Sequence, residues 1–355
     1  MDWDKLIELP IYQLNKADKM PIFNEHLIQL AQHHYQQSEN YRDIINFLYQ
    51  GSVFENEVPA LAVRLFKHHL LKSINDKDIF KITTSSGTTS QQVSRIVLDK
   101  ENISRQQKIL VKIVQQWLGR KRLPMLIIDH PNVIKDKFSY SARGVGIQGL
   151  SLFGHHHTYA LNEDMTLNMN AIEEFFEKYT AEPVFIFGFT FIIWQYFIQA
   201  LKKEKTKAQF CLRNATLLHS GGWKKLQEQA VSNQEFTAQC QQVLGKVNVH
   251  NFYGMVEQTG TIYVECELGY LHCPVWSDVI IRSKKDLTPE KNGVEGIIQV
   301  NSLLPTSYPG HALLTEDLGV LLGEDDCACG RKGKYFRVNG RLAKAEVRGC
   351  SDTQA

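Results

Sequence analysis

No charge of one sign dominates this sequence, in which 40 Lys and Arg residues stand against 38 Asp and Glu residues and give a formal net charge of +2. Because these charges are spread along the chain, they create no strong field for a nucleic acid or for an anionic membrane surface. The 355 residues are 43% hydrophobic and 10% aromatic, which is enough to bury a substantial core. We therefore expect a folded globular protein of about one to three domains that binds no nucleic acid.

A long uninterrupted apolar run is missing as well. The most apolar stretch, residues 183–194, falls short of the about 20 apolar residues that a helix needs to cross a bilayer, and Gly188 interrupts it. Instead of a membrane span, we expect a buried strand at 184–187, a turn at Gly188 and a helix over about 191–202.

The sequence also lacks a recognisable targeting segment at its start, and its seven cysteines are an odd number. This cysteine usage is typical of a reducing compartment, in which thiols stay free or bind a metal ion. We therefore expect a cytoplasmic location for the protein.

Strand and helix patterns alternate in the central part of the chain. Asp99 is a good N-cap for a helix that ends at Gly119, and a strand at 125–128 follows directly. Strand, helix and strand at this spacing predict an α/β fold with a largely parallel sheet. The expected parts are a mostly helical N-terminal region at 1–75, an α/β core at 76–264, a β-rich subdomain at 265–345 and a mobile tail at 346–355.

A loop rich in hydroxyl groups joins two strand-like runs, residues 78–82 and 93–98. Gly87 permits a positive φ and a close backbone approach, while the hydroxyl groups around it can donate to an anion together with backbone N–H groups. The loop lacks the Gly-Lys-Ser/Thr ending of a Walker A motif. We interpret it as a phosphate-binding loop, with a polar solvent turn as the alternative. The predicted phosphate-binding residues are Ser85, Ser86, Gly87, Thr88, Thr89 and Ser90.

Glycines mark two further places where the backbone can approach a ligand. A strand at 216–219 runs into Gly221 and Gly222, where the backbone can lie flat against a planar base. The glycine-rich segment 141–149 resembles a dinucleotide fingerprint only loosely. There we expect close backbone packing beside a ligand, with Arg143 facing an anion.

Three further motifs follow in order along the chain. They are Asn251-Phe252-Tyr253-Gly254-Met255-Val256-Glu257, Thr315-Glu316-Asp317-Leu318-Gly319 and Gly340-Arg341. By residue chemistry, Tyr253 can stack on adenine, and Glu257 offers a hard oxygen ligand for Mg²⁺. Asp317 can accept hydrogen bonds from both ribose hydroxyls, and Arg341 supplies positive charge near phosphates.

Together with the loop at 84–90, these motifs resemble four signatures of the adenylate-forming enzymes: the Ser/Thr-rich phosphate loop, Asn-x-Tyr-Gly-x-x-Glu, the ribose-binding Thr-x-Asp and the Gly-Arg hinge. The resemblance implies that ATP and Mg²⁺ are bound, with Tyr253, Gly254 and the glycines at 221–222 in the nucleotide site. It also implies the large α/β N-terminal domain of these enzymes, with layered sheets and helices and a small β-rich subdomain.

Within that superfamily, the chain is most similar to the phenylacetate–CoA ligases and to the acyl-protein synthetases of the bacterial luminescence fatty-acid reductase. The similarity includes residues 187–191, 265–272, 327–331 and 346–351. Two departures stand out. Ser90 replaces the final glycine of the phosphate loop, and the chain stops 14 residues after Arg341, without the C-terminal lysine domain. The short length favours the acyl-protein synthetases.

The resemblance implies a reaction in two steps. A fatty or other hydrophobic carboxylic acid is activated as acyl-AMP with release of pyrophosphate, and the acyl group then passes to Cys350 and on to a partner such as an acyl reductase. A thiol near a chain end is suited to receive and pass on an acyl group, although Cys350 could be an incidental tail cysteine. An acyl- or aryl-CoA ligase is one alternative function, and a non-catalytic acyl- or nucleotide-binding subunit is another.

Four residues with metal-binding side chains form two close pairs, Cys-x₅-His and Cys-x-Cys. They are Cys266, His272, Cys327 and Cys329. Structural zinc prefers four sulfur or nitrogen ligands in a tetrahedron, so these pairs predict a zinc site. Cys273 could take the place of His272, and four reduced side chains without metal remain the alternative.

Overall fold

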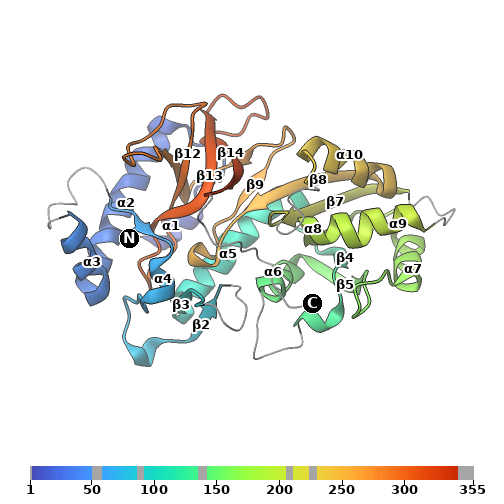
Figure 1. The fold of residues 1–355 in the computed structure, drawn as a ribbon, viewed down its shortest axis with the longest axis horizontal. Helices are drawn as coiled ribbons and strands as arrows, with labels where there is room; N and C mark the ends of the chain where they lie inside the picture. Colours follow the sequence, from blue (N-terminus) through green and yellow to red (C-terminus); the bar gives the residue numbers. More distant parts are fainter. Residues whose placement is uncertain are drawn as a thin grey trace. The chain divides into compact units, whose positions relative to one another are not determined.

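The computed structural model describes residues 2–49, 58–85, 92–134, 142–204, 211–223 and 230–342 (Figure 1). Contacts among these residues divide the chain into two compact units. The first unit comprises the described parts of Met1–Ser85, Ser90–Ile113 and Gly254–Glu346, and the second comprises the described part of Val114–Tyr253.

The second unit contains a parallel sheet with the strand order β8-β7-β6-β4-β5. These strands are β4 (Leu123–Ile128), β5 (Gly154–Tyr159), β6 (Val184–Phe189), β7 (Leu212–Ser220) and β8 (Gly245–Tyr253). Every residue of β6 is buried, which is typical of a parallel strand covered by helices on both faces. The predicted α/β organisation with a parallel sheet is therefore confirmed in this unit.

Helices lie on both faces of this parallel sheet. On one face, Gly146 of α6 is packed so closely that an added Cβ would lie 3.1 Å from the ring of Phe189. On the other face, the ring of Phe236 from α10 lies 4.6 Å from the ring of His219. His219 pairs in register with Gly188, the neighbour of Phe189, so its side chain lies on the face opposite that of Phe189. The helices are α6 (Ala142–Leu150), α7 (Met169–Tyr179), α8 (Thr190–Ile192), a π-helix (Ile193–Ile198), α9 (Gln199–Lys203) and α10 (Asn233–Leu244).

The first unit is built on a mainly antiparallel sheet with the strand order β11-β12-β13-β14-β10-β9, to which β1 adds parallel to β13. The strands are β1 (Leu61–Ala62), β9 (Tyr263–Glu265), β10 (Leu271–His272), β11 (Ser277–Arg282), β12 (Glu295–Ser302), β13 (Ala312–Glu324) and β14 (Lys334–Arg341). The antiparallel pairing gives this part of the chain the β-rich character expected from the sequence.

Helices of the N-terminal region pack on this sheet around a buried cluster that joins Leu6, Phe23 and Leu27 to Leu303 and Ala312. The helices are α1 (Trp3–Ile7), α2 (Lys16–Gln37), α3 (Glu39–Tyr49) and α4 (Leu65–His68). They confirm the helical pattern predicted near the start of the chain.

The helix α5 (Lys100–Leu118) begins and ends where the sequence predicted. The carboxylate of Asp99 accepts a hydrogen bond from the N–H of Asn102 at 2.6 Å, as an N-cap does. Gly119, with φ of +73°, follows the last helical turn.

The segment around Gly188 differs from the sequence-based expectation. The strand β6 continues through Gly188 to Phe189, and the helical segment begins at Thr190 with a π-helical stretch from Ile193. A Cβ at Gly188 would lie 2.8 Å from Ile193 and 2.9 Å from Ile128. The glycine therefore permits close packing inside the sheet and does not make the predicted turn.

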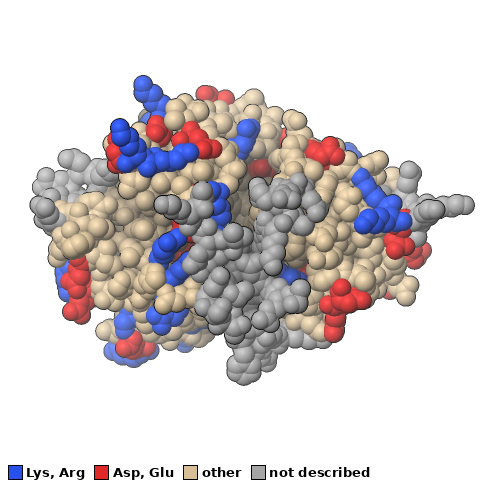
Figure 2. Space-filling view, in the orientation of Figure 1, with Lys and Arg blue, Asp and Glu red and all other residues tan. Residues whose placement is uncertain are grey.

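The glycine-rich segment at 141–149 forms α6 from Ala142 onward, and the anion that faces Arg143 belongs to the protein itself. The buried carboxylate of Asp129 accepts from Arg143 Nε at 3.0 Å and also pairs with its Nη2. No helix in the described part of the chain is both long and apolar enough to cross a membrane. Basic and acidic side chains are interspersed on the face drawn in Figure 2, among the residues that are described.

Candidate functional sites

The hydroxyl-rich loop is carried by an antiparallel hairpin of β2 (Lys81–Thr84) and β3 (Arg95–Leu98). Ser85 closes the base of the loop, because its N–H donates to the Ser94 carbonyl at 3.1 Å and its hydroxyl accepts from the Ser94 N–H at 2.9 Å. The remaining predicted loop residues, Ser86, Gly87, Thr88, Thr89 and Ser90, lie outside the described residues.

Glu257 is held in a short 3₁₀ turn, Val256–Gln258, and is 7% exposed. The side chain of Gln258 anchors this turn by donating to the carbonyls of Val300 at 3.0 Å and Gly310 at 2.8 Å. Burial raises the pKa of Glu257, and the charge of Asp317 acts in the same direction, whereas the Ser94 hydroxyl and the charge of Lys67 oppose it. A buried carboxyl of this kind is suited to receive a cation.

Asp317 and Arg341 face each other on the neighbouring strands β13 and β14, where they are in register. Arg341 Nε donates to Asp317 Oδ1 at 3.1 Å. The Thr315 hydroxyl donates to the Ile298 carbonyl at 2.7 Å and accepts from the Asp317 N–H at 3.1 Å, so it fixes the backbone before the aspartate. The motifs at 315–319 and 340–341, which are separate in the sequence, therefore lie together in the first unit.

Two cations that the sequence analysis missed lie near these residues. Arg64 Nε donates to Glu316 Oε1 at 2.7 Å, next to Asp317 in β13. The charge of Lys67 acts on the carboxyl of Glu257. Neither residue belongs to a recognised motif. Both are brought close to these carboxylates by the pairing of the short strand β1 with β13, which the sequence does not signal.

In the second unit, Tyr253 is the last residue of β8, and Gly221 and Gly222 follow the carboxyl end of the adjacent parallel strand β7. Ser220 of β7 pairs in register with Phe252 of β8, and its hydroxyl donates to the Phe252 carbonyl at 2.8 Å. Gly221 adopts a φ of +87°, and a Cβ on Gly222 would meet nothing within 4 Å. The carboxyl ends of parallel strands are where ligands bind in open α/β sheets.

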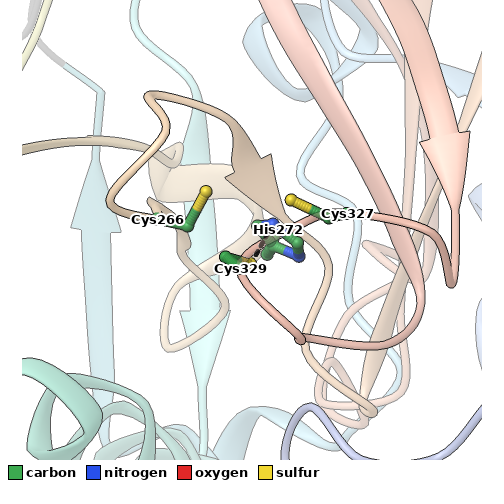
Figure 3. A group of neighbouring side chains, drawn as sticks. All are labelled: Cys266, His272, Cys327 and Cys329. Carbon is green, nitrogen blue, oxygen red and sulfur yellow. Dashed lines mark hydrogen bonds between the residues drawn. The ribbon is translucent and has the colours of Figure 1, made fainter.

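The four predicted metal ligands converge in the first unit, with their ligand atoms all within 4.8 Å of one another (Figure 3). Cys266 follows β9 and His272 lies in β10, while Cys327 and Cys329 lie in the turn between β13 and β14. Gly269 and Gly330, with φ of +77° and +84°, shape the two turns. Cys329 Sγ lies 3.4 Å from His272 Nε2, and His272 Nδ1 finds no hydrogen-bond partner among the described residues.

The neutral imidazole in this cluster fits a metal site, and the thiols would bind a metal ion after losing their protons to it. Burial lowers the pKa of His272 to about 4, so its imidazole is neutral at pH 7 and keeps a lone pair. Burial raises the pKa of Cys266 and raises that of Cys327 to about 12. Although burial opposes it, hydrogen bonds with the Arg331 backbone and the Cys327 side chain lower the pKa of Cys329. Three cysteine thiolates and one neutral imidazole are a donor set that zinc prefers, and binding would release the thiol protons.

A family model described as "Acyl-protein synthetase, LuxE" matches residues 3–355 of this chain. The long-chain-fatty-acid–luciferin-component ligase of Vibrio harveyi is 24% identical over 328 residues, which cover 90% of this chain and 84% of the relative.

The chain is also similar to solved structures of 2-hydroxyisobutyryl-CoA ligase. The open conformation in complex with 2-HIB-AMP and CoA has a TM-score of 0.69 at 15% identity and covers 94% of this chain and 77% of that chain. The thioesterification state of the same ligase has a TM-score of 0.68 at 15% identity, with 93% and 69% covered. At these identities the likeness establishes the fold, which is the one expected for adenylate-forming enzymes. The family match extends over almost every residue, and the chain therefore belongs to the LuxE acyl-protein synthetases, a family of ligases.

Proposed function

We propose that this protein activates a fatty or other hydrophobic carboxylic acid with ATP. The carboxylate attacks the α-phosphorus, a new oxygen–phosphorus bond gives acyl-AMP, and the bond to the β-phosphate breaks so that pyrophosphate leaves. The observation that carries the proposal is that Asp317, Arg341 and Glu257, from separate motifs, lie near one another in the first unit. The name of the Vibrio harveyi relative supports a long-chain fatty acid as the substrate.

Each motif residue has a role in this proposal. Tyr253 and Gly254 hold the adenine together with the glycines at 221–222, and Asp317 accepts hydrogen bonds from the ribose hydroxyls. Arg341 balances the charge of Asp317 and lies near the phosphates, and Ser85 begins the loop that holds them. Catalysis is then mainly positioning and electrostatic stabilisation of the charge on the phosphates.

Glu257 is the residue that would hold Mg²⁺. Its carboxyl is a hard oxygen ligand. Burial raises its pKa, and a neighbouring divalent cation would lower the pKa again by favouring the ionised form. When bound, Mg²⁺ supplies neutralisation of charge on the phosphate oxygens. Glu257 thus counts among the catalytic residues of this proposal.

Cys350, which lies outside the described residues, receives the acyl group in the second step. Its thiolate attacks the acyl carbon of acyl-AMP, a carbon–sulfur bond forms, and the bond to the phosphate oxygen breaks so that AMP leaves. The thioester then passes to a partner protein such as an acyl reductase. Six other cysteines are free thiols, which supports a cytoplasmic location.

The four converging side chains of Cys266, His272, Cys327 and Cys329 would hold a structural Zn²⁺ ion. In a tetrahedral site with bonds of about 2.3 Å, ligand atoms stand about 3.8 Å apart, so a small contraction of the cluster is enough. A fully ligated ion has no open position for substrate, and we therefore assign this site no part in the reaction.

Acid-dependent exchange of labelled pyrophosphate into ATP tests the adenylation step. With MgATP and acids from hexanoic to stearic, exchange is expected to depend on the acid. Glu257→Ala and Asp317→Ala are each expected to lower the exchange rate by at least about 10²-fold, the range for removing a positioned electrostatic group. Asp286→Ala, in an exposed turn near neither motif, is the matched control and should retain the wild-type rate.

The outcomes separate this function from its alternatives. Binding of nucleotide or acid without any exchange would favour a non-catalytic binding subunit. Exchange followed by formation of acyl-CoA on addition of CoA would favour a CoA ligase instead of an acyl-protein synthetase.

A further inference from the structure

The short segment at 61–68 begins with a strand that pairs with β13 just before the Thr315–Asp317 motif. Leu61 and Ala62 of β1 pair with Leu313 and Leu314 of β13 in parallel register, and the Val63 N–H donates to the Leu314 carbonyl at 2.9 Å. Because the two strands are parallel, the residues that follow Ala62 lie beside the residues that follow Leu314.

The first turn of this segment is fixed to the motif by charge. Arg64 Nε donates to Glu316 Oε1 at 2.7 Å, and Arg341 Nη2 lies 3.5 Å from Glu316 Oε2. Arg341 also donates to Asp317. Two arginines thus engage the neighbouring carboxylates of Glu316 and Asp317 in β13, so much of the charge of these four side chains is already balanced within the protein.

The next turn of the segment is fixed beside Glu257 by packing. Phe66 is fully buried and meets the ring of Tyr308 edge to face, with ring centroids 6.1 Å apart. Tyr308 in turn lies close to Glu257. An added Cβ on Gly310 would lie 2.3 Å from the Tyr308 ring and 2.7 Å from the Glu257 carbonyl oxygen, so these three residues are tightly packed.

Lys67 follows Phe66 and is half-buried at this position. Its charge favours the ionised form of Glu257, although burial of that carboxyl has the larger effect on its pKa. A lysine ammonium is a compact point charge with three donors on a flexible stem, and it can turn toward an anionic oxygen without a change in the backbone.

We propose that Lys67 is a further catalytic residue, whose ammonium contacts the phosphates of ATP and stabilises the charge on departing pyrophosphate. This inference rests on the proposed adenylation function. Lys67 keeps its proton throughout, so it changes no bond and acts only through charge and hydrogen bonding. The fold brings it from the N-terminal region to a site whose recognised motifs all lie later in the chain.

Equilibrium binding of ATP and of adenosine, together with pyrophosphate exchange, tests this role. Lys67→Met is expected to weaken ATP binding and to lower the exchange rate by about 10²-fold, while adenosine binding stays unchanged. Lys67→Arg keeps the charge and should restore most of both. Lys72→Met is the matched control, because Lys72 pairs with Asp76 and should behave like wild type.

Three results would overturn the inference. Lys67→Met could exchange pyrophosphate at the wild-type rate, it could lose adenosine and ATP binding equally, or Lys67→Arg could be as impaired as Lys67→Met. Equal loss of adenosine and ATP binding, or an equally impaired Lys67→Arg, would indicate a structural role for Lys67. A lower melting temperature of the variant would accompany such a role. A wild-type protein without any acid-dependent exchange would instead remove the proposed function, and the inference with it.

Discussion

The carboxyl of Glu257 illustrates how burial changes the chemistry of a single residue. In water a glutamate is ionised at pH 7, but burial raises the pKa of this one, and Asp317 adds to the effect. The hydroxyl of Ser94 and the charge of Lys67 act in the opposite direction. A cation beside Glu257 would favour the ionised form, so we expect metal and nucleotide to bind more tightly as the pH rises through that pKa.

The acyl acceptor is a second question at the scale of one residue. If Cys350 is the acceptor, labelled acid with ATP should leave a hydroxylamine-sensitive adduct on the protein. Cys350→Ser should abolish this adduct and preserve pyrophosphate release, because only the thiol step is removed. The readout is label retained after denaturing gel electrophoresis.

Cys211→Ser is the matched control for that experiment, since Cys211 is an exposed thiol in the described part of the chain. This variant should carry as much label as wild type. Label that persists in Cys350→Ser would assign the acceptor role to another residue or to tightly bound acyl-AMP, contrary to our proposal.

At the scale of elements, two turns meet at the cysteine and histidine cluster and are joined by more than the predicted ligands. Arg331, from the turn between β13 and β14, donates to both oxygens of Glu267 in the first turn at 2.6 and 3.1 Å. The N-terminal segment also takes part, because the Tyr12 carbonyl accepts from the Lys332 N–H at 2.8 Å. A metal ion here would cross-link the two turns, and the N-terminal segment is joined to the second turn by that backbone hydrogen bond.

We therefore expect one zinc ion per chain in protein purified without metal-affinity resin. Cys327→Ser should lose the zinc and lower the melting temperature, because the cross-link between the two turns is removed. Elemental analysis and thermal unfolding measure both effects. Cys273→Ala is the control: Cys273 is buried nearby but outside the cluster, so this variant should keep its zinc.

Metal-free wild-type protein with an unchanged melting temperature after chelation would remove the zinc site. Loss of zinc from Cys273→Ala, with retention in a His272 variant, would instead favour the alternative ligand that the sequence left open.

Some elements could be predicted from the sequence and others could not, for physical reasons. The helix after Asp99 was predictable because its cap and its terminal glycine are local signals. The end of β6 was not predictable, because the role of Gly188 depends on its contacts with Ile128 and Ile193. Only the tertiary structure brings these two side chains next to the glycine. The convergence of the metal-ligand pairs was predictable from their spacing and chemistry, whereas the approach of Lys67 was not.

At the scale of the whole molecule, each unit contains histidines buried in the neutral form. In the first unit His34 and His311 are fully buried and stack with ring centroids 4.9 Å apart. His34 lies 2.7 Å from the Ser73 hydroxyl and 2.9 Å from the Pro305 carbonyl, and Tyr41 contacts His311 at 3.3 Å. In the second unit His219 is buried against Thr190, whose hydroxyl lies 2.9 Å from its Nδ1.

Acid should therefore destabilise the protein. Burial lowers the pKa of His34 well below its usual range and lowers the pKa values of His311 and His219 to about 3. The unfolded chain takes up protons below about pH 6.5, so stability is retained above that pH and falls as the pH decreases toward the folded-state values. Each such histidine contributes a slope of up to about 1.4 kcal/mol per pH unit.

Urea unfolding followed by circular dichroism between about pH 7 and pH 5 measures this dependence, with the midpoint expected to fall on acidification. His311→Asn should be less stable than wild type near neutral pH, because it disturbs the stacked pair, but its stability should fall less steeply with acid. His26→Asn removes a histidine on the outer part of α2 whose ring nitrogen lies 3.3 Å from Gln29, and should keep the wild-type slope. A midpoint that stays constant or rises on acidification would contradict burial of these histidines in the neutral form.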